Sequence, residues 1–186
     1  MIEIEVKAKC DPQKVREILD SPIKIVYEED HYLNHPCRDF SKTDEALRIR
    51  ITRSKDKEAI EITYKGPKID LISKSREEIT VKIGDIKNFL SIKELFSKLG
   101  FKEVGIIKKR REIYEMGGTK IYLDYVEGYI SGQKISLGWF VEVEVIAEYS
   151  SENVEKVLNI LKSLTDSPPI RESYLELLLR GGSYQI

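Results

Sequence analysis

Cysteine is scarce in this chain: Cys10 and Cys37 occur without a CxxC pair or a nearby histidine cluster. A disulfide framework and a zinc site are therefore not indicated, and we expect both thiols to be reduced. Long hydrophobic runs are also missing. No segment approaches the roughly 20 apolar residues of a membrane span, and the first residues do not form the apolar region of a signal peptide. We therefore expect a soluble cytoplasmic protein.

Neither sign of charge is in excess, although charged residues make up 34% of the chain. The 31 basic and 32 acidic side chains leave a formal net charge of -1, so the chain has no overall attraction for nucleic acid or for an anionic membrane. Any anion-binding site must therefore be local. A length of 186 residues suits a single domain over residues 1–186 with a sizeable core.

The first nine residues, MIEIEVKAK, alternate between apolar and charged side chains. Successive side chains of a β-strand point to opposite faces, so Ile4 and Val6 share one face and Glu3, Glu5 and Lys7 share the other. An antiparallel sheet with one solvated face produces this alternation without any function. The charged face is therefore either a wet surface or a site.

The same alternation recurs along the chain and predicts a protein made mainly of strands. Further strands are expected near residues 23–33, 46–53, 58–65, 75–83, 104–115, 119–126 and 136–146. Lys55-Asp56 and Gly117-Gly118 are typical of tight hairpin turns, which indicates antiparallel pairing of neighbouring strands. Periodicity alone does not say which face of such a sheet lies inside.

Helix signals interrupt the strands at two places. A helix over residues 11–20 begins with Asp11 as its N-cap, followed by proline in the first turn. A second helix is expected to begin at a capping box formed by Ser91 and Glu94 and to end at Gly100.

Two more helices are expected near the C-terminal end. Apolar residues at helical spacing predict one over residues 151–164. A short last helix carries Tyr174 and Leu178 on its apolar face and is expected to end before Gly181-Gly182. The predicted fold therefore combines a large sheet with a few short helices.

Charges of one sign are concentrated on particular strands. Acidic pairs occur at Glu3/Glu5 and Glu142/Glu144, and basic pairs at Arg48/Arg50 and Lys109/Arg111. Like charges two residues apart on one strand lie within about 7 Å and repel each other unless opposite charge comes between them. That opposite charge can come from a neighbouring strand, or from a metal ion and a polyanion.

Acidic and basic strands in one sheet are what a metal-assisted phosphate site requires. Hard divalent cations such as Mg²⁺ bind carboxylate oxygens and share their coordination shell with substrate phosphates. Arginine and lysine side chains bind phosphate oxygens. If the sheet curls with this face inward, its charges line a channel.

Eight sequence elements occur in a characteristic order over residues 2–146. They are Glu3-x-Glu5-x-Lys7, the stretch from Asp30 to Tyr32, Arg48-x-Arg50, Lys65 in TYKGP, Arg76-x-Glu78, Lys109-x-Arg111-x-x-Tyr114, Asp124, and LGxFxExE ending in Glu142-x-Glu144. This ordered set resembles the CYTH superfamily, the triphosphate tunnel metalloenzymes. Tyr174-x-x-Leu177-Leu178 is also similar to its members known as class IV adenylate cyclases.

The resemblance implies an α+β fold in which eight antiparallel strands close into a β-barrel, the triphosphate tunnel, with helices packed outside. It assigns Mg²⁺ or Mn²⁺ as cofactor and the metal role to Glu3, Glu5, Asp124, Glu142 and Glu144. It assigns triphosphate binding to Lys7, Arg48, Arg50, Lys65, Arg76, Lys109 and Arg111. The catalytic set would be Glu3, Glu5, Lys7, Glu142 and Glu144, and Glu78 would pair with one of the cations.

The resemblance implies metal-dependent phosphoryl transfer on a small triphosphate such as ATP, thiamine triphosphate or tripolyphosphate. A class IV adenylate cyclase would convert ATP to cyclic AMP and pyrophosphate, and an inorganic or organic triphosphatase would use water instead. A binding module for polyphosphate or nucleotides, without turnover, is a third alternative. No nucleic-acid or membrane partner is expected, and related proteins are often homodimers.

A base-binding pocket would distinguish a cyclase from a triphosphatase. ALRIR, which contains Arg48 and Arg50, stands where several cyclases of the superfamily have a GRLKxR type of segment, and this departure keeps the triphosphatase alternative open. His31 and His35 lie in the loop-like stretch YEEDHYLNHPCRDF and are interpreted as surface residues.

Overall fold

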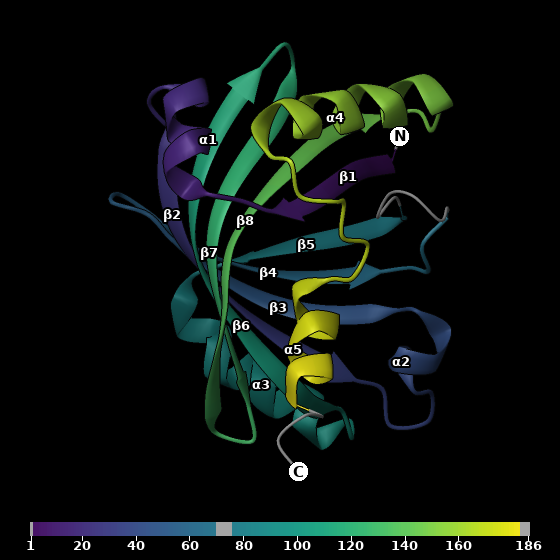
Figure 1. The fold of residues 1–186 in the computed structure, drawn as a ribbon. Coiled ribbons are helices and arrows are strands. Elements are labelled where there is room, and N and C mark those ends of the chain that lie inside the picture. The colour runs from purple at the N-terminus through teal and green to yellow at the C-terminus, as the bar shows by residue number, and fades with distance from the viewer. Residues whose placement is uncertain (1, 70–75, 183–186) are drawn as a thin grey trace.

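Eight antiparallel strands form the body of the protein, for which the computed structural model describes residues 2–69 and 76–182. The strands are β1 (Ile2–Lys9), β2 (Lys24–Asn34), β3 (Ala46–Arg53), β4 (Glu58–Lys65), β5 (Glu78–Gly84), β6 (Lys102–Met116), β7 (Thr119–Ile130) and β8 (Gln133–Ala147). They form one sheet in the order β1-β8-β7-β6-β2-β3-β4-β5, which curls into a half-barrel (Figure 1). The predicted α+β class and antiparallel pairing are confirmed.

The half-barrel is open along one side, so the prediction of a closed barrel is overstated. β1 and β5 are the edges of the sheet, and within the described residues an isolated bridge between Glu3 and Arg76 is the strand-like contact that joins the two sides. The edge of β1 is covered instead by a segment near the C-terminal end, since the backbone N–H of Ile170 donates to the carbonyl of Lys7 at 2.6 Å. The segment at Ile170, and not β5, therefore pairs with this part of the β1 edge.

Two helices cover the convex face at one end of the sheet, and both match their predictions. α1 (Pro12–Leu19) is capped by Asp11, and α4 (Ser151–Leu164) lies against β1 and β8. The core beneath them consists of Ile4, Val6, Ala8, Val15, Tyr114, Ile121, Leu123, Val141, Val143, Val154, Val157, Leu161 and Leu164. Because the apolar face of β1 packs outward against these helices, its charged face is turned inward.

A third helix covers the convex face at the other end, and it begins earlier than predicted. A 3₁₀ turn, η1 (Ile86–Asn88), leads directly into α3 (Phe89–Lys98). The carboxylate of Asp85 accepts a hydrogen bond from the backbone N–H of Lys87 at 2.9 Å and starts the helical chain there. The capping box predicted at Ser91 and Glu94 is therefore wrong, because both residues already lie inside the helix.

The last helix packs inside the half-barrel, which corrects the expectation that all helices lie outside. α5 (Tyr174–Gly182) lies against β6, β7 and β8 (Figure 1), and it includes the two glycines that were expected to follow it. Leu178 of α5 is fully buried on this concave face. Gly128 of β7 permits the close approach, since a Cβ atom there would lie 2.4 Å from a methyl group of Leu178.

Most strand predictions hold, with differences at their ends. β3 and β4 match residues 46–53 and 58–65, whereas β6, β7 and β8 extend beyond the predicted ranges. The strand predicted at 75–83 begins at Glu78, and position 75 lies outside the described residues. The short helix α2 (Phe40–Thr43) was not predicted.

The two predicted hairpins are present. Gly117 and Gly118 have φ angles of 57° and 72° and join Met116 to its antiparallel partner Thr119. This left-handed conformation favours glycine and matches the twist of the two strands. Within residues 2–69 and 76–182, none of the helices combines the length and the apolar character needed to cross a membrane.

A buried carboxylate ties α1 to the sheet. Glu112 lies on the convex face of β6 and is 2% exposed, and it accepts hydrogen bonds from Arg16 of α1 at 2.7 Å and from the Tyr114 hydroxyl at 2.7 Å. Burial acts against its charge, but the hydrogen bonds from Arg16, Arg110 and Tyr114 hold the pKa of Glu112 at about 2, below its ordinary value of 4.5.

We expect the free energy of unfolding to fall as the pH is lowered from about 5 toward 2, because the unfolded chain binds a proton at Glu112 before the folded protein does. Glu112→Gln should remove part of this dependence, at most about 3 kcal/mol. Denaturant unfolding at several pH values measures the effect, with the exposed Glu115→Gln as control. Identical pH slopes for Glu112→Gln and the parent protein would contradict the linkage.

Candidate functional site

The concave face of the half-barrel gathers the charged residues that the sequence singled out. Alternation along the strands and the observed registers place Glu3, Glu5, Lys7, Arg48, Arg50, Lys65, Lys109, Arg111, Asp124, Glu142 and Glu144 on this face. Arg76 joins them through its bridge to Glu3. Of the two interpretations of the charged face, a wet surface is excluded for most of it, since these side chains are largely buried.

A cavity of about 630 Å³ opens on the concave face. Basic side chains line much of it, namely Arg48, Arg50, Lys65, Arg76, Lys109, Arg111 and Lys120. Acidic side chains line it mainly from the strands at the two chain ends, namely Glu3, Glu5, Glu142 and Glu144, together with Glu28, Glu61 and Glu78. The size is within the range of small-molecule sites.

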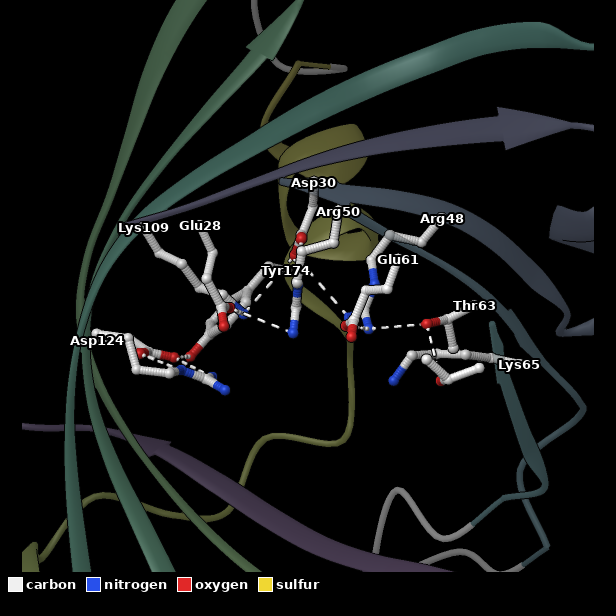
Figure 2. A network of polar contacts seen from close by, with 12 residues as sticks. Glu28, Asp30, Arg48, Arg50, Glu61, Thr63, Lys65, Lys109, Asp124 and Tyr174 are labelled. Carbon is white, nitrogen blue, oxygen red and sulfur yellow. Dashed lines mark hydrogen bonds and ion pairs between the residues drawn. The ribbon is translucent and has the colours of Figure 1, made fainter. Parts of the chain in front are cut away.

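Two carboxylates of β2 hold the central basic residues. Arg50 donates two hydrogen bonds to Asp30, at 2.5 and 2.7 Å, and lies 3.3 Å from Glu28 (Figure 2). Lys109 lies 3.0 Å from the same carboxylate oxygen of Glu28. Burial opposes ionisation, but Arg50 and Lys109 hold the pKa of Glu28 at about 2, so both cations are paired with charged partners.

Arg48 is held much more loosely than Arg50, its neighbour on the same face of β3. Its closest contacts are 3.4 Å to the Thr63 hydroxyl, 3.8 Å to Glu61 and 3.9 Å to Asp30. Among the residues that the structure describes, its buried Nε atom has no hydrogen-bond partner. A buried guanidinium without strong partners retains most of its capacity to bind an anion.

Arg111 of β6 is fixed by two other acidic residues. It donates to both oxygens of Asp124, at 2.8 and 2.5 Å, and also to Glu142. The Tyr174 hydroxyl donates to Asp124 at 2.9 Å. Asp124 is fully buried and serves as the anchor of Arg111 in this structure. The metal role predicted for Asp124 stays a prediction.

Near the open side of the half-barrel, Lys65 pairs with Glu78 across β4 and β5, as expected for Glu78. Arg76 donates to the carbonyl of Gly66 at 3.3 Å.

Lys7 of β1 is fully buried beside α5. Its ammonium group lies 4.1 Å from the ring centre of Tyr174 and donates to the carbonyl of Glu172. The predicted contact between Lys7 and a triphosphate stays a prediction.

Three carboxylates face each other across β1 and β8. Glu5 and Glu144 are direct register partners, and Glu3 precedes Glu5 on the same face. Burial, followed by the charges of Glu3 and Glu5, raises the pKa of Glu144 to about 7. A cation would relieve this repulsion.

The donor set at this end of the cavity suits a hard divalent cation, because it consists of carboxylate oxygens. In residues 2–69 and 76–182, no group of three or more His, Cys, Asp or Glu side chains converges closely enough to hold a metal ion alone. Mg²⁺ is commonly bound by one or two carboxylates, with water and substrate phosphates completing the shell. The residues present fit that shared mode of binding.

Comparison with known proteins identifies the family. The model of the CYTH domain matches residues 1–174. The chain belongs to the CYTH family. A Methanocaldococcus jannaschii protein named “Putative adenylate cyclase” is 45% identical to this CYTH chain over 188 residues, covering 95% of this chain and 98% of the relative.

Solved structures share the CYTH fold. A protein from Pyrococcus horikoshii OT3 has a TM-score of 0.83 at 44% identity, over 96% of this chain and 99% of the other. A Hippeastrum protein described as having a dominant triphosphatase activity has a TM-score of 0.65 at 16% identity, over 99% of this chain and 97% of the other. At that identity the second comparison shows the fold alone.

Both histidines of this CYTH chain lie away from the charged face. His31 points to the convex side, where its ring nitrogens contact Glu103 at 2.7 Å and Glu29 at 3.0 Å. It is buried, so the expectation of a surface residue is wrong for His31. The Nδ1 atom of His35 accepts a hydrogen bond from the backbone N–H of Cys37 at 3.1 Å. Neither residue lines the cavity.

Sequence reasoning missed several residues that shape the CYTH site. Glu28, Glu61, Lys120 and Tyr122 line the cavity without having been assigned a role. The alternation through YEED places Glu28 on the same face as Asp30, so this pair could have been found from the strand pattern. No sequence motif pointed to Lys120 or Tyr122. They line the cavity because they share a face of β7 with Asp124.

The part of the cavity between α2 and α5 is lined by apolar side chains as well as charged ones. Apolar groups from Leu33, Phe40, Ala46, Leu47, Val104, Leu175 and Leu179 line it there, and we call this part the apolar end. The carboxylates of Asp39, Asp44, Glu45 and Glu176 surround it. Lys68 links Asp44 and Glu176, at 2.7 and 3.0 Å.

Proposed function

We propose that this CYTH protein is a metal-dependent enzyme that acts on an organic triphosphate, and that it is an adenylate cyclase which converts ATP to cyclic AMP and pyrophosphate. The observation that carries the proposal is the cavity itself, in which a basic wall faces a carboxylate wall and continues into an apolar end. The family and the name of the M. jannaschii relative support the assignment to triphosphate chemistry.

The basic wall is prepared for a polyanion. Arg50, Lys109 and Arg111 are held by carboxylates before any ligand arrives, so binding phosphate oxygens requires little reorganisation. Arg48 offers a guanidinium with weak partners. Charge spreads over the non-bridging and leaving oxygens during displacement at phosphorus, and groups fixed in advance stabilise that charge.

The acidic wall is proposed to hold the cofactor. Glu3, Glu5, Glu142 and Glu144 would bind Mg²⁺ or Mn²⁺ together with phosphate oxygens. When bound, the ion supplies positive charge to the phosphates and lowers the pKa of the attacking hydroxyl group. A module that merely binds polyphosphate gains nothing from acidic groups in its pocket, so these carboxylates favour turnover.

The apolar end favours an organic triphosphate over inorganic tripolyphosphate. A chain of three phosphates has no use for the surface of Phe40, Ala46 and Leu175, whereas a ring system would bury it. The surrounding carboxylates accept hydrogen bonds, and an adenine amino group can donate one. In the cyclase reaction the ribose 3′-hydroxyl loses its proton to solvent and its oxygen bonds to the α-phosphorus, while the bond from that phosphorus to the bridging oxygen breaks and pyrophosphate leaves.

A triphosphatase is the second candidate. The Hippeastrum protein of the same fold is described as having a dominant triphosphatase activity, and both reactions use the same charged walls. In that case water attacks the terminal phosphorus and orthophosphate is released. Water access to the cavity at its open side is compatible with this route.

Product analysis separates the candidates. The purified protein is incubated with Mg²⁺ or Mn²⁺ and, separately, with ATP, thiamine triphosphate or tripolyphosphate, and the products are resolved by chromatography and ³¹P NMR. Cyclic AMP with pyrophosphate supports the cyclase, and orthophosphate from any substrate supports a triphosphatase. Binding without turnover of any of the three would leave the protein as a binding module and contradict the proposal.

We expect Ala46→Leu to weaken ATP binding about tenfold or more, because the added side chain fills the apolar end. Tripolyphosphate binding should remain within about twofold, since the charged walls are untouched. Calorimetric titration of both ligands measures the difference. Ala59→Leu on β4 serves as the control, because Ala59 is half-buried and does not line the cavity. Equal losses for both ligands would contradict an organic group at this end.

A further inference from the structure

Tyr174 connects α5 to the charged wall through its hydroxyl group. The residue is the first of α5, is 5% exposed, and donates a hydrogen bond of 2.9 Å to the carboxylate of Asp124. Burial and the charge of Asp124 raise the pKa of Tyr174 well above its ordinary value, so the hydroxyl keeps its proton and remains a donor. The bond therefore fixes the orientation of the Asp124 carboxylate.

Asp124 passes this restraint to Arg111. Its two oxygens accept hydrogen bonds from two nitrogens of Arg111, at 2.8 and 2.5 Å. The oxygen that accepts the 2.5 Å bond also accepts the hydrogen bond from Tyr174. A bidentate pair fixes the plane of a guanidinium as well as its position. Arg111 lines the cavity, so the series of contacts from Tyr174 through Asp124 ends at the site.

Lys7 holds Tyr174 from the other side. Its ammonium group lies 4.1 Å from the centre of the Tyr174 ring and donates to the carbonyl of Glu172, two residues before α5. Phe140 of β8 packs against the same ring at 5.0 Å between centroids. Both contacts involve the ring or the backbone, so they would survive removal of the hydroxyl oxygen alone.

We propose that Tyr174 is a positioning residue, whose hydroxyl fixes Asp124 and thereby sets the Arg111 guanidinium toward the triphosphate. The proposal rests on the proposed function, because it assumes that Arg111 contacts phosphate oxygens. The docking of α5 does not depend on the hydroxyl, since Leu178 is fully buried against Gly128 on the same strand as Asp124. Tyr174→Phe therefore separates positioning from helix docking.

Tyr114 provides a matched control on the opposite face of the sheet. Its hydroxyl also donates to a buried carboxylate, that of Glu112, at 2.7 Å, and the residue is 3% exposed. Tyr114→Phe should cost similar stability without changing the cavity. The two variants differ in which face of the sheet loses its hydrogen bond.

The test measures tripolyphosphate binding by calorimetry without metal, so that no turnover occurs, and KM and kcat separately with metal. We expect Tyr174→Phe to weaken tripolyphosphate binding about five- to twentyfold, less than the loss of a direct charge-assisted contact, because the hydroxyl acts through Asp124 and Arg111. Tyr114→Phe should stay within about twofold. In an Arg111→Gln background, Tyr174→Phe should cause no further loss, because its effect passes through Arg111.

Three results would overturn the inference: unchanged binding in Tyr174→Phe, an equal loss in Tyr114→Phe, or a full additional loss in the Arg111→Gln background. Failure of the proposed function looks different. In that case the parent protein turns over none of tripolyphosphate, ATP and thiamine triphosphate with metal, and if it also binds none of them the inference falls with it. Parent binding combined with any of the three results rejects the role of Tyr174 alone.

Discussion

Glu144→Gln is expected to abolish metal-dependent turnover while making the metal-free protein more stable. Glutamine keeps the size of the side chain but removes a charge that a divalent cation requires, so a loss of at least about 100-fold in turnover is expected. The same change removes the repulsion of Glu144 by Glu3 and Glu5. Such a trade between activity and stability is typical of functional sites.

The direction of the stability change depends on pH. Burial and the neighbouring carboxylates raise the pKa of Glu144 from 4.5 to about 7. A carboxyl group with a raised folded-state pKa costs stability as the pH rises from its unfolded value through its folded value. Glu144→Gln should therefore increase the free energy of unfolding at about pH 8, by at most about 3 kcal/mol, and have little effect near pH 4.

Chemical denaturation with and without Mg²⁺, combined with assays of product release, checks both parts. Mg²⁺ should stabilise the parent protein more than the variant, because binding to the folded state raises stability. The exposed Glu115→Gln is the control and should behave like the parent. Undiminished turnover in Glu144→Gln would remove this residue from the metal site.

Arg48→Gln is expected to weaken triphosphate binding strongly with little loss of stability. Its contacts at 3.4 to 3.9 Å contribute little to the fold, and within residues 2–69 and 76–182 its buried Nε has no partner to lose. Removing a charge-assisted contact to phosphate should cost about 1.5–3 kcal/mol of binding free energy, or roughly 10- to 150-fold in affinity. Titration with tripolyphosphate and denaturant unfolding measure the two quantities.

Arg50→Gln provides the contrast two residues away. It leaves Asp30 and Glu28 buried with one cation fewer, so the fold should lose about 3–5 kcal/mol in addition to affinity. Equal stability losses for Arg48→Gln and Arg50→Gln would show that the observed pairing does not describe the solution state. Unchanged affinity in Arg48→Gln would mean that this guanidinium does not contact phosphate.

The strands and most helices could be predicted because their signals are local. Alternation identified β3 and β4 to the residue, and Gly117-Gly118 marked a hairpin that requires left-handed backbone. The residues on the concave face could be identified because side chains alternate between the two faces of each strand. The ordered motifs that resemble the CYTH superfamily pointed to the same residues. The capping box at Ser91 failed for an equally local reason, since Asp85 offered an earlier start.

The placement of α5 and the pairing of charges could not be read in this way. The apolar face of α5 could pack on either side of the sheet. Gly128 of β7 leaves room for Leu178 on the concave side, but the sequence does not show that these two residues meet. Lys7 belongs to the ExExK motif, yet a C-terminal segment 165 residues away along the chain buries it. Contacts between distant segments depend on how the chain folds back, which periodicity does not encode.

The antiparallel strands, the two faces of each strand and the residues that share the charged face could be derived from the sequence, because side-chain direction follows from backbone geometry. That β1 and β5 remain apart as edges of an open half-barrel is seen only in the folded protein. The tertiary structure also decided that Arg50 and Arg111 are tightly held while Arg48 is not. These outcomes depend on strand order, curvature and neighbours that only the folded chain brings together.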